Sequence, residues 1–311
     1  MVIKMKINPI RADYIKLGSN GGEWERECIY DKQILKLGYR EIDHYNCLNK
    51  EWDKVEEQCA RFRSDKGAIS RDVKQIRMFY EDGEDVLWVT FHANQLWWCF
   101  SKSEVTQGPN NTKIRQVNGK WRCKDINEHS LQMDQLSGSL LSMEGFRGTI
   151  CSVKEFKYLI NKINGIIPKE IEETQAKLSE LEKSLETIIK NLNWKDFEIL
   201  IDLIFRQAGW QRVSRLGGIQ KTIDLDLRSP ITEEMYAVQV KSQAGLSQFK
   251  EYQEKFQDMK GYSKIYFVVH KPDSDLKNYN MKDDAFELIF SHKIARLAVK
   301  YGLTEWIMNK G

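Results

Sequence analysis

Apolar residues in the middle of the chain recur at alternating steps of four and three positions. The series begins at Ile167 and ends at Ile188, while the other positions are mainly Glu, Lys, Gln and Ser. This spacing places the apolar residues along one side of a helix. Pro168 stands in the first turn, where its missing N–H is tolerated. The pattern predicts a long helix whose apolar seam packs either on a neighbouring domain or against a second copy of the chain. The seam comprises Ile167, Ile171, Thr174, Leu178, Leu181, Leu185 and Ile188.

Upstream of this helix the pattern is mostly that of strands. Residues 86–100 form two β-rich runs around Ala93-Asn94, which indicates a hairpin. Ser152 and Glu155 have the spacing of a capping box and predict a helix that continues to about Asn164. A compact, β-rich barrel with a few helices is the simplest fold for this half. The other predicted elements are strands at 14–17, 34–39 and 146–151 and helices at 52–62 and 70–80.

Downstream of the long helix, helical and strand patterns alternate. A helix is predicted from Trp194 to Ala208, with Asn193 as its N-cap and Gly209 as its stop. The order of elements that follows predicts an α/β domain with a mixed sheet. These elements are strands at 211–214, 222–228, 236–241 and 264–270 and a helix at 246–257.

Composition narrows the class of protein. A chain of 311 residues with 41% hydrophobic content is long enough for two domains. No apolar run approaches the roughly 18 residues that span a bilayer, and the start has no secretory signal, so we expect a cytoplasmic protein. The six cysteines form no C-x-x-C pair and are expected to be reduced. His44 and Cys47 have the spacing of half a zinc site, but no second pair follows.

Polar residues alternate with apolar ones on two of the predicted strands. Asp224 and Asp226 share one face of their strand, and Gln239 and Lys241 share one face of the next. Carboxylates opposite a lysine can hold Mg²⁺, polarise a phosphate and orient a water molecule. Glu198, on the preceding helix, can supply another carboxylate. The same pattern also fits a solvated cross-strand pair with no catalytic role.

The ordered series Phe197-Glu198, Gly209-Trp210, Gly217-Gly218, Ile223-Asp224 and Gln239-Val240-Lys241 resembles the nuclease core of Mrr-like restriction endonucleases, within the PD-(D/E)xK superfamily. The resemblance covers about residues 193–270. It implies a restriction-endonuclease-like α/β core that hydrolyses DNA with Mg²⁺. Residues 219–222 lack the family's first Asp and the Gly before the catalytic Asp, which leaves the ligand set open.

The resemblance also implies roles for individual residues. Asp224 matches the metal-binding Asp, Gln239 the residue that replaces the second acid, Lys241 the catalytic lysine and Glu198 the helix carboxylate. The main-chain carbonyl of Val240 is a further metal ligand. Asp226 is an alternative to Asp224 for the metal.

Tryptophan is concentrated in the first half, which contains six of the nine, at 24, 52, 88, 97, 98 and 121. The aromatic spacing of residues 76–100 resembles the EVE and PUA-like group of small barrels, which bind nucleic acid and modified bases. Such a domain could flip a modified cytosine into an aromatic pocket. For any single tryptophan, packing in the core is the competing interpretation. The candidates for the base pocket are Trp24, Trp97, Trp98, Tyr45 and Asn94.

A local group of basic residues in the first half can contact DNA phosphates. Because the net charge is only +3, such contacts must come from their arrangement rather than from bulk charge. The group consists of Arg61, Arg63, Lys66, Arg71, Lys74 and Arg77.

These observations predict a two-domain restriction endonuclease of mixed α+β and α/β class. Residues 1–151 form a PUA-like recognition domain, 152–192 a helical linker and 193–311 the nuclease. We expect a homodimer on double-stranded DNA that cuts near modified cytosine. The alternatives are a conventional sequence-specific enzyme protected by a partner methyltransferase, and a DNA- or RNA-binding module with a degenerate nuclease core.

Overall fold

The computed structural model describes residues 5–18, 24–213, 223–257 and 261–311. The chain divides into two compact units, Met1–Pro168 and Lys169–Gly311. The division falls inside the segment 152–192. Helix α5 (Phe156–Ile163) belongs to the N-terminal unit, and helix α6 (Lys169–Asn191) begins the C-terminal unit. Among the described residues, no helix is both long and apolar enough to cross a membrane.

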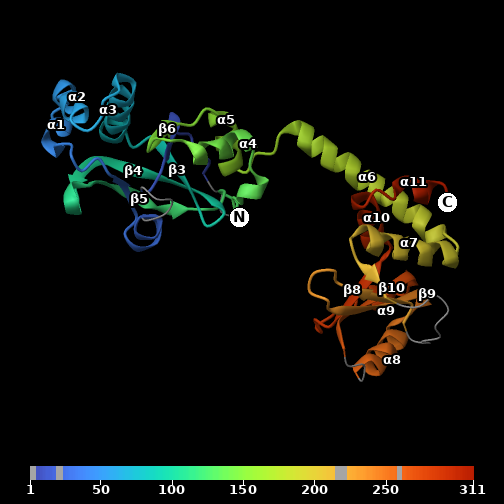
Figure 1. The fold of residues 1–311 in the computed structure, drawn as a ribbon. Coiled ribbons are helices and arrows are strands. Elements are labelled where there is room, and N and C mark those ends of the chain that lie inside the picture. Colours follow the sequence, from blue (N-terminus) through green and yellow to red (C-terminus); the bar gives the residue numbers. More distant parts are fainter. Residues whose placement is uncertain (1–4, 19–23, 214–222, 258–260) are drawn as a thin grey trace. The chain divides into compact units, whose positions relative to one another are not determined.

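The strands of the N-terminal unit form one mixed sheet in the order β2-β5-β4-β3-β1-β6 (Figure 1). The predicted hairpin is confirmed, with Ala93 and Asn94 at positive φ of 50° and 64° between β3 and β4. No pairing joins the edge strands β2 and β6 within the described residues, so the PUA-like barrel stays a prediction. The strands are β1 (Arg11–Ile15), β2 (Ile34–Leu37), β3 (Val86–His92), β4 (Gln95–Gln107), β5 (Lys113–Arg122) and β6 (Ile150–Ser152).

Each face of this sheet has its own apolar core. Phe79 of α3 packs with Trp88 and Trp97 on one face, and Leu159 of α5 packs with Trp98 on the other. Adjacent tryptophans on β4 can serve both cores because successive side chains of a strand point to opposite faces. Besides α5, the helices of this unit are α1 (His44–Leu48), α2 (Trp52–Ala60), α3 (Lys66–Glu81) and α4 (Gly138–Leu141), and a π-helical turn covers Arg26–Asp31.

Two local predictions in this unit are wrong. The N-cap of α5 is Glu155, without a side-chain capping bond, and the Glu155 carboxylate instead accepts a hydrogen bond from the Ser137 hydroxyl. The predicted capping box is therefore replaced by the hydrogen bond between Glu155 and Ser137. The closing strand predicted at 146–151 is limited to Ile150–Ser152, because residues 147–149 form a bend. Strand β5 was not predicted, since its polar residues interrupt the apolar pattern.

The C-terminal unit has a five-stranded sheet in the order β11-β10-β9-β8-β7. Strands β9, β10 and β11 are parallel, and β8 and β7 run antiparallel to their neighbours. Helices α6, α7, α10 and α11 lie on one side of the sheet and α8 on the other (Figure 1). The mixed α/β sheet is as expected. The strands are β7 (Gln211–Arg212), β8 (Leu225–Arg228), β9 (Met235–Ala244), β10 (Tyr262–Pro272) and β11 (Phe286–Phe290). The helices after α6 are α7 (Trp194–Gln207), α8 (Leu246–Gln257), α9 (Ser274–Lys277), α10 (Ser291–Lys300) and α11 (Thr304–Met308).

Helix α7 begins and ends where the sequence predicts. The Asn193 side chain accepts a hydrogen bond from the Lys195 N–H at 3.0 Å, which caps the helix. Gly209 follows the helix with φ +90°, a conformation that a residue with a side chain rarely adopts. These signals place the following strands, and therefore the candidate site, at a defined point in the chain.

The apolar seam of α6 has two different environments. Leu185 is buried in the core of the C-terminal unit, and Ile188 packs against the same core. Ile171, Leu178 and Leu181 remain 48%, 43% and 38% exposed. The first half of the helix thus presents an apolar stripe at its surface, whereas the second half is packed against the unit.

Two buried carboxylates in the N-terminal unit should make its stability depend on pH. Asp13 and Asp82 both accept hydrogen bonds from the Arg11 guanidinium, and each has one further buried oxygen, which gains a partner in the other carboxyl group only when one of the two is protonated. Burial, followed by the hydrogen bond and charge of Asp13, raises the pKa of Asp82 to about 7. The folded chain therefore binds more protons than the unfolded chain between about pH 4 and pH 7, and its stability falls as the pH rises through that range.

We expect Asp82→Asn to remove this pH dependence and to raise the thermal midpoint at pH 8 by about 2–4 °C. Differential scanning calorimetry from pH 5 to pH 8 measures both effects. Asp85→Asn, an exposed neighbour, is the control. A wild-type midpoint that does not fall between pH 5 and pH 7 would contradict the prediction.

Candidate active site

The candidate site is built around the carboxylate of Asp224, which lies just before β8. Its backbone N–H donates to the Val238 carbonyl at 3.0 Å, so the strand pairing fixes its position. Its Oδ2 atom accepts hydrogen bonds from the Val240 N–H at 2.6 Å and from the Gln239 amide. The structure thus joins residues that were predicted from two separate segments.

The hydrogen bonding fixes the orientation of the Gln239 amide. Its nitrogen must face the Asp224 carboxylate, because the opposite orientation would bring two oxygen acceptors together. Gln239 is 2% exposed, and its Oε1 atom has no hydrogen-bond partner. A buried carbonyl oxygen without a partner costs free energy unless a ligand binds it. We interpret this atom as a ligand position of the site.

Lys241 and Glu198 complete the group. The Lys241 ammonium lies 4.8 Å from the ring centroid of Tyr252 on α8, and the ring face stabilises the charge there. Burial and the nearby Asp224 charge raise the pKa of Glu198, while Lys241 lowers it. Asp224 is exposed as a residue, but partial burial of its carboxylate raises its pKa, against the opposing effects of Val240, Lys241 and Gln239. The pKa of each carboxylate therefore depends on the charges around it: Asp224 and Lys241 act on Glu198, and Lys241 acts on Asp224.

Asp226 lies in a different environment. Its Oδ1 atom accepts a hydrogen bond from the Tyr262 hydroxyl on β10 at 2.7 Å. This contact gives Asp226 a structural partner, whereas the partners of Asp224 are Gln239 and Val240. Gly217, Gly218 and the Ile-Gln-Lys-Thr departure lie in residues 214–222, outside the described residues.

The donor set fits a hard cation. The Asp224 carboxylate, the Gln239 Oε1 atom and the Val240 carbonyl are oxygen donors, the kind that Mg²⁺ prefers. The unpartnered Gln239 oxygen is the observation that supports this fit. Glu198 can add a second carboxylate from α7.

A second candidate site lies in the N-terminal unit, in a pocket of about 340 Å³. Trp24 lines it, as do Tyr39 and Phe62, so aromatic rings come from three separate segments. Glu41 and Thr149 add polar groups. The volume is in the range of small-ligand pockets.

Buried ionic contacts hold the walls of this pocket. The buried Asp72 accepts hydrogen bonds from the Tyr39 hydroxyl at 2.9 Å and from Arg63 Nε at 2.8 Å. The Lys36 ammonium lies 4.7 Å from the ring centroid of Trp24. The buried Lys113 donates to the Tyr39 carbonyl at 2.7 Å. These contacts orient the side chains before any ligand binds.

Four other base-pocket candidates are placed elsewhere. Trp97 and Trp98 are 8% and 4% exposed, and their indole N–H groups donate to the carbonyls of His92 and Lys124. The structure gives both tryptophans a packing role, because each belongs to one of the two cores. Tyr45 is 67% exposed on α1, and Asn94 forms the hairpin tip. Tyr39, Phe62, Glu41 and Thr149 were not predicted, since no local pattern marks a pocket wall.

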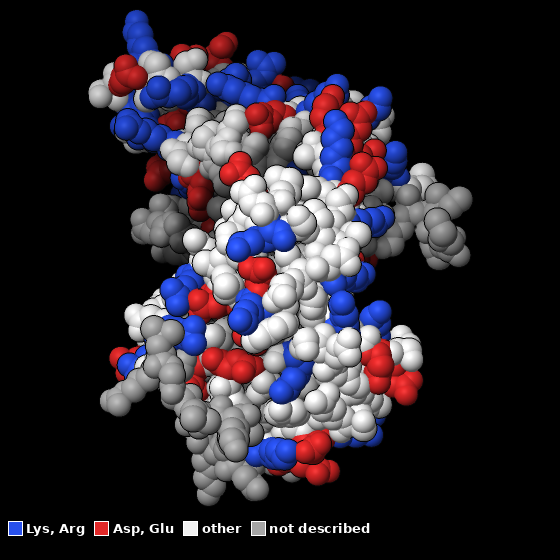
Figure 2. Space-filling view, turned by 90° about the vertical axis from the view of Figure 1, so that its right-hand side faces the viewer, with Lys and Arg blue, Asp and Glu red and all other residues white. Residues whose placement is uncertain are grey.

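Some of the predicted phosphate contacts already have partners. Arg63 binds Asp72, and Arg77 Nε lies 2.6 Å from Glu81. Arg61, Arg71 and Lys74 are exposed and form no ion pair among the described residues. Figure 2 shows basic side chains interspersed with acidic ones.

The described cysteines are free thiols, and four of the six are buried. The imidazole Nδ1 of His44 lies 2.8 Å from the Tyr80 hydroxyl.

Among the described residues, no cluster of three or more His, Cys, Asp or Glu side chains could hold a metal. A cation at the candidate active site would therefore depend on the amide and carbonyl oxygens as well as on the carboxylates.

Asp224, Gln239 and Lys241 thus lie on two neighbouring segments of a mixed sheet, with the Glu198 carboxylate on the preceding helix. Residues 189–274 match the restriction endonuclease family of Mrr catalytic domains. The C-terminal unit therefore contains an Mrr-type restriction endonuclease domain.

Solved structures with similarity to the chain are also restriction enzymes. The DNA modification-dependent restriction endonuclease AspBHI is 12% identical, with a TM-score of 0.31 over 89% of this chain and 78% of that one. The MspJI restriction endonuclease in complex with a 27-mer oligonucleotide is 12% identical, with a TM-score of 0.27 over 78% of this chain and 67% of that one. No curated protein sequence matches the chain. We base the assignment on the family match and on the geometry of the site.

Proposed function

We propose that the protein is a Mg²⁺-dependent DNA endonuclease that cuts near modified cytosine. The observation that carries the nuclease assignment is the cluster of Asp224, Gln239 and Lys241, with the unpartnered Gln239 oxygen, inside the Mrr-type domain. The substrate is the phosphodiester bond of double-stranded DNA, which water hydrolyses.

Each residue of the cluster has a chemical role in this proposal. Asp224 and the Gln239 and Val240 oxygens hold the cation, with Glu198 as an additional ligand. When bound, Mg²⁺ supplies polarisation of the phosphate and a lower pKa for a coordinated water. The Lys241 ammonium orients the attacking water by a hydrogen bond and offsets negative charge on the phosphate. Tyr252 holds that ammonium in place.

The recognition half of the proposal depends on the Trp24 pocket. Nucleobases stack on aromatic rings with about 1–3 kcal/mol per base. A carboxylate accepts a hydrogen bond from the cytosine amino group, and Glu41 lines the pocket without a hydrogen-bond or ion-pair partner among the described residues. The aromatic walls can enclose a methyl or hydroxymethyl substituent. These features favour a flipped, modified cytosine as the ligand.

The test uses purified full-length protein, Mg²⁺ and three plasmids of the same sequence. The plasmids carry unmodified, methylated or hydroxymethylated cytosine. We expect cleavage of a modified plasmid and none of the unmodified one. Cleavage of unmodified DNA at a fixed sequence would instead indicate a conventional enzyme with a partner methyltransferase. DNA or RNA binding without any cleavage would overturn the nuclease assignment.

We propose that two copies pair through the exposed seam of α6, because cutting both strands requires two active sites. Ile171, Leu178 and Leu181 occupy core positions of a heptad repeat. In a parallel pair, Lys177 lies beside Glu182 of the partner subunit, and the opposite charges attract.

Leu178→Glu should convert the dimer to a monomer and change double-strand cleavage to nicking. Light scattering coupled to size-exclusion chromatography measures the mass, and gel electrophoresis distinguishes nicked from linear plasmid. Lys177→Glu should weaken the dimer, and the double variant Lys177→Glu/Glu182→Lys should restore it. A wild-type monomer that linearises plasmid in one binding event would refute the proposal.

A further inference from the structure

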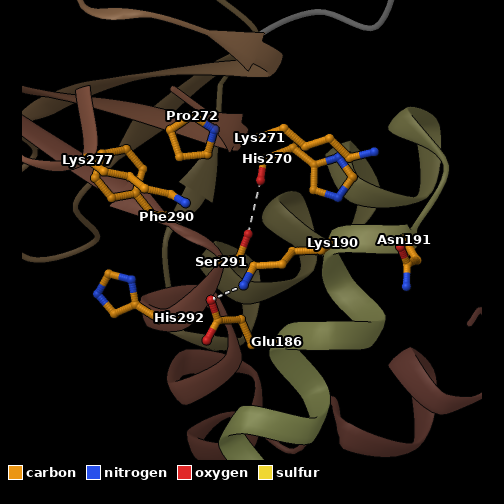
Figure 3. A pocket seen from close by; sticks show the side chains of 10 residues that line it. All are labelled: Glu186, Lys190, Asn191, His270, Lys271, Pro272, Lys277, Phe290, Ser291 and His292. Carbon is orange, nitrogen blue, oxygen red and sulfur yellow. Dashed lines mark hydrogen bonds and ion pairs between the residues drawn. The ribbon is translucent and has the colours of Figure 1, made fainter. Parts of the chain in front are cut away.

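The C-terminal unit contains a cavity of about 500 Å³ that the candidate active site does not use. It lies between α6, the end of β10 and the junction of β11 with α10 (Figure 3). Pro272 and Phe290 form apolar walls. The remaining lining groups are polar and include three lysines, Lys190, Lys271 and Lys277, and one carboxylate, Glu186.

Two lysines and an imidazole from three elements approach the same space. The ammonium groups of Lys190 on α6 and Lys277 on α9 point into the cavity, and the His292 ring on α10 flanks it (Figure 3). Lys190 Nζ lies 2.6 Å from a Glu186 carboxylate oxygen, which neutralises one charge. Lys277 has no ion pair within the described part of the chain. The cavity therefore keeps excess positive charge.

The start of α10 adds a second source of positive potential. The helix follows β11 directly, and no side chain caps its first turn. The Ser291 hydroxyl is engaged with the His270 carbonyl at 3.1 Å, so it does not cap the backbone N–H groups of this turn. The first N–H groups of a helix have no partners inside the helix and attract anions. Lysines around a helix N-terminus form a site for a phosphate group.

The cavity is connected to the candidate active site through α7 and β10. His270, which lines the cavity, stacks on Phe197 with ring centroids 4.3 Å apart, and the next residue is Glu198. On β10, Val269 pairs with Lys241 of β9. The cavity residues of β10 follow Val269 directly, so the backbone that lines the cavity is close in the strand register to the backbone of Lys241. A DNA strand held at Lys241 can therefore present another of its phosphates to the cavity.

We propose that this cavity binds a backbone phosphate of the DNA strand beside the one that is cut, through Lys190, Lys277, His292 and the N-terminus of α10. The proposal depends on the proposed function for its ligand. Neighbouring phosphates fix the register of a strand without reading its sequence. By holding a neighbouring phosphate, the cavity would determine which phosphate of the strand lies at the active site.

The test measures DNA binding separately from cleavage. All variants carry Lys241→Ala, so that DNA stays intact, and fluorescence anisotropy gives the affinity for a duplex at several salt concentrations. We expect Lys190→Gln/Lys277→Ala to weaken binding by about tenfold and to reduce the salt slope by about one, as for a lost phosphate contact. Lys300→Ala, at the other end of α10, should leave the slope unchanged.

Two further measurements, cleavage kinetics and binding of inorganic phosphate, distinguish failure of the cavity inference from failure of the nuclease assignment. In the cleaving protein, Lys190→Gln/Lys277→Ala should raise KM more than it lowers kcat, and a circular dichroism melt confirms folding. If wild type cleaves DNA while the variant has the wild-type salt slope, the cavity inference is wrong and the nuclease assignment stands. If the slope changes but wild type cleaves nothing, the phosphate site stands and the nuclease assignment fails. Inorganic phosphate that binds the wild type but not the variant, without a change in the DNA slope, would make the ligand a free phosphate and overturn the proposal.

Discussion

Replacing Lys241 by alanine should reduce the rate of DNA cleavage by at least about a thousandfold. The ammonium is the charged donor of the site, and the Tyr252 ring at 4.8 Å shows that it is held in place. Alanine removes both its hydrogen bond to water and its charge beside the phosphate. DNA binding should change much less, because many other contacts hold the duplex. Single-turnover cleavage and anisotropy measure the two effects separately.

Asp224, just before β8, and Asp226, within it, provide a matched control for this prediction. Asp224→Asn should abolish cleavage, because it removes a metal ligand and weakens the hydrogen bonds to Gln239 and Val240. Asp226→Asn keeps a hydrogen-bond acceptor for Tyr262 and should retain most of the activity. If Asp226→Asn is inactive and Asp224→Asn active, the metal site has been assigned to the wrong carboxylate. Cleavage that survives Lys241→Ala would exclude the whole cluster.

Replacing Trp24 by alanine should reduce cleavage of modified plasmid by about 5- to 150-fold, the loss of 1–3 kcal/mol of base stacking. The indole is one wall of the 340 Å³ pocket, and Lys36 fixes its orientation. Affinity for unmodified DNA should remain, because phosphate contacts supply it. Cleavage rates and affinities for matched modified and unmodified duplexes test the prediction.

Two variants separate base recognition from general damage to the fold. Trp52→Ala removes an indole that bonds Glu81 on α3 and lies outside the pocket, so the preference for modified DNA should be unchanged. Gly38→Val adds atoms beside the indole, since a Cβ at this glycine would lie 3.8 Å from the Trp24 ring. It should narrow the pocket and lower the preference while leaving every aromatic ring present. An undiminished preference in both Trp24→Ala and Gly38→Val would refute the pocket.

Local patterns predicted the parts of the nuclease domain well. The Asn193 cap and Gly209 stop bound α7, and strict alternation places Gln239 and Lys241 on one face of β9. These are properties of short segments, because a cap, a positive φ and a two-residue period depend on neighbours in sequence. Sequence similarity then linked the segments to a restriction endonuclease domain.

Other local patterns were overridden by contacts across the fold. The Glu155 carboxylate accepts a hydrogen bond from Ser137 instead of forming the predicted capping box. The polar strand β5 contains the buried Lys113, whose ammonium donates to backbone carbonyls. Trp97 and Trp98 appeared equivalent to Trp24 as pocket candidates, but β4 lies between two cores and both of its tryptophans pack there. No window of the sequence contains the partners that decide these outcomes.

The sequence by itself indicated that this protein carries two units and that the second contains a restriction endonuclease domain, and it predicted Asp224, Gln239 and Lys241 as the site residues of that domain. Only the tertiary structure decided that the Asp224 carboxylate bonds Gln239, that Trp24, Tyr39 and Phe62 line one pocket, and that lysines of α6 and α9 line one cavity with the start of α10. The physical reason is the range of the interactions. Secondary structure follows from the preferences of neighbouring residues, whereas a site depends on side chains that folding brings together from distant parts of the chain.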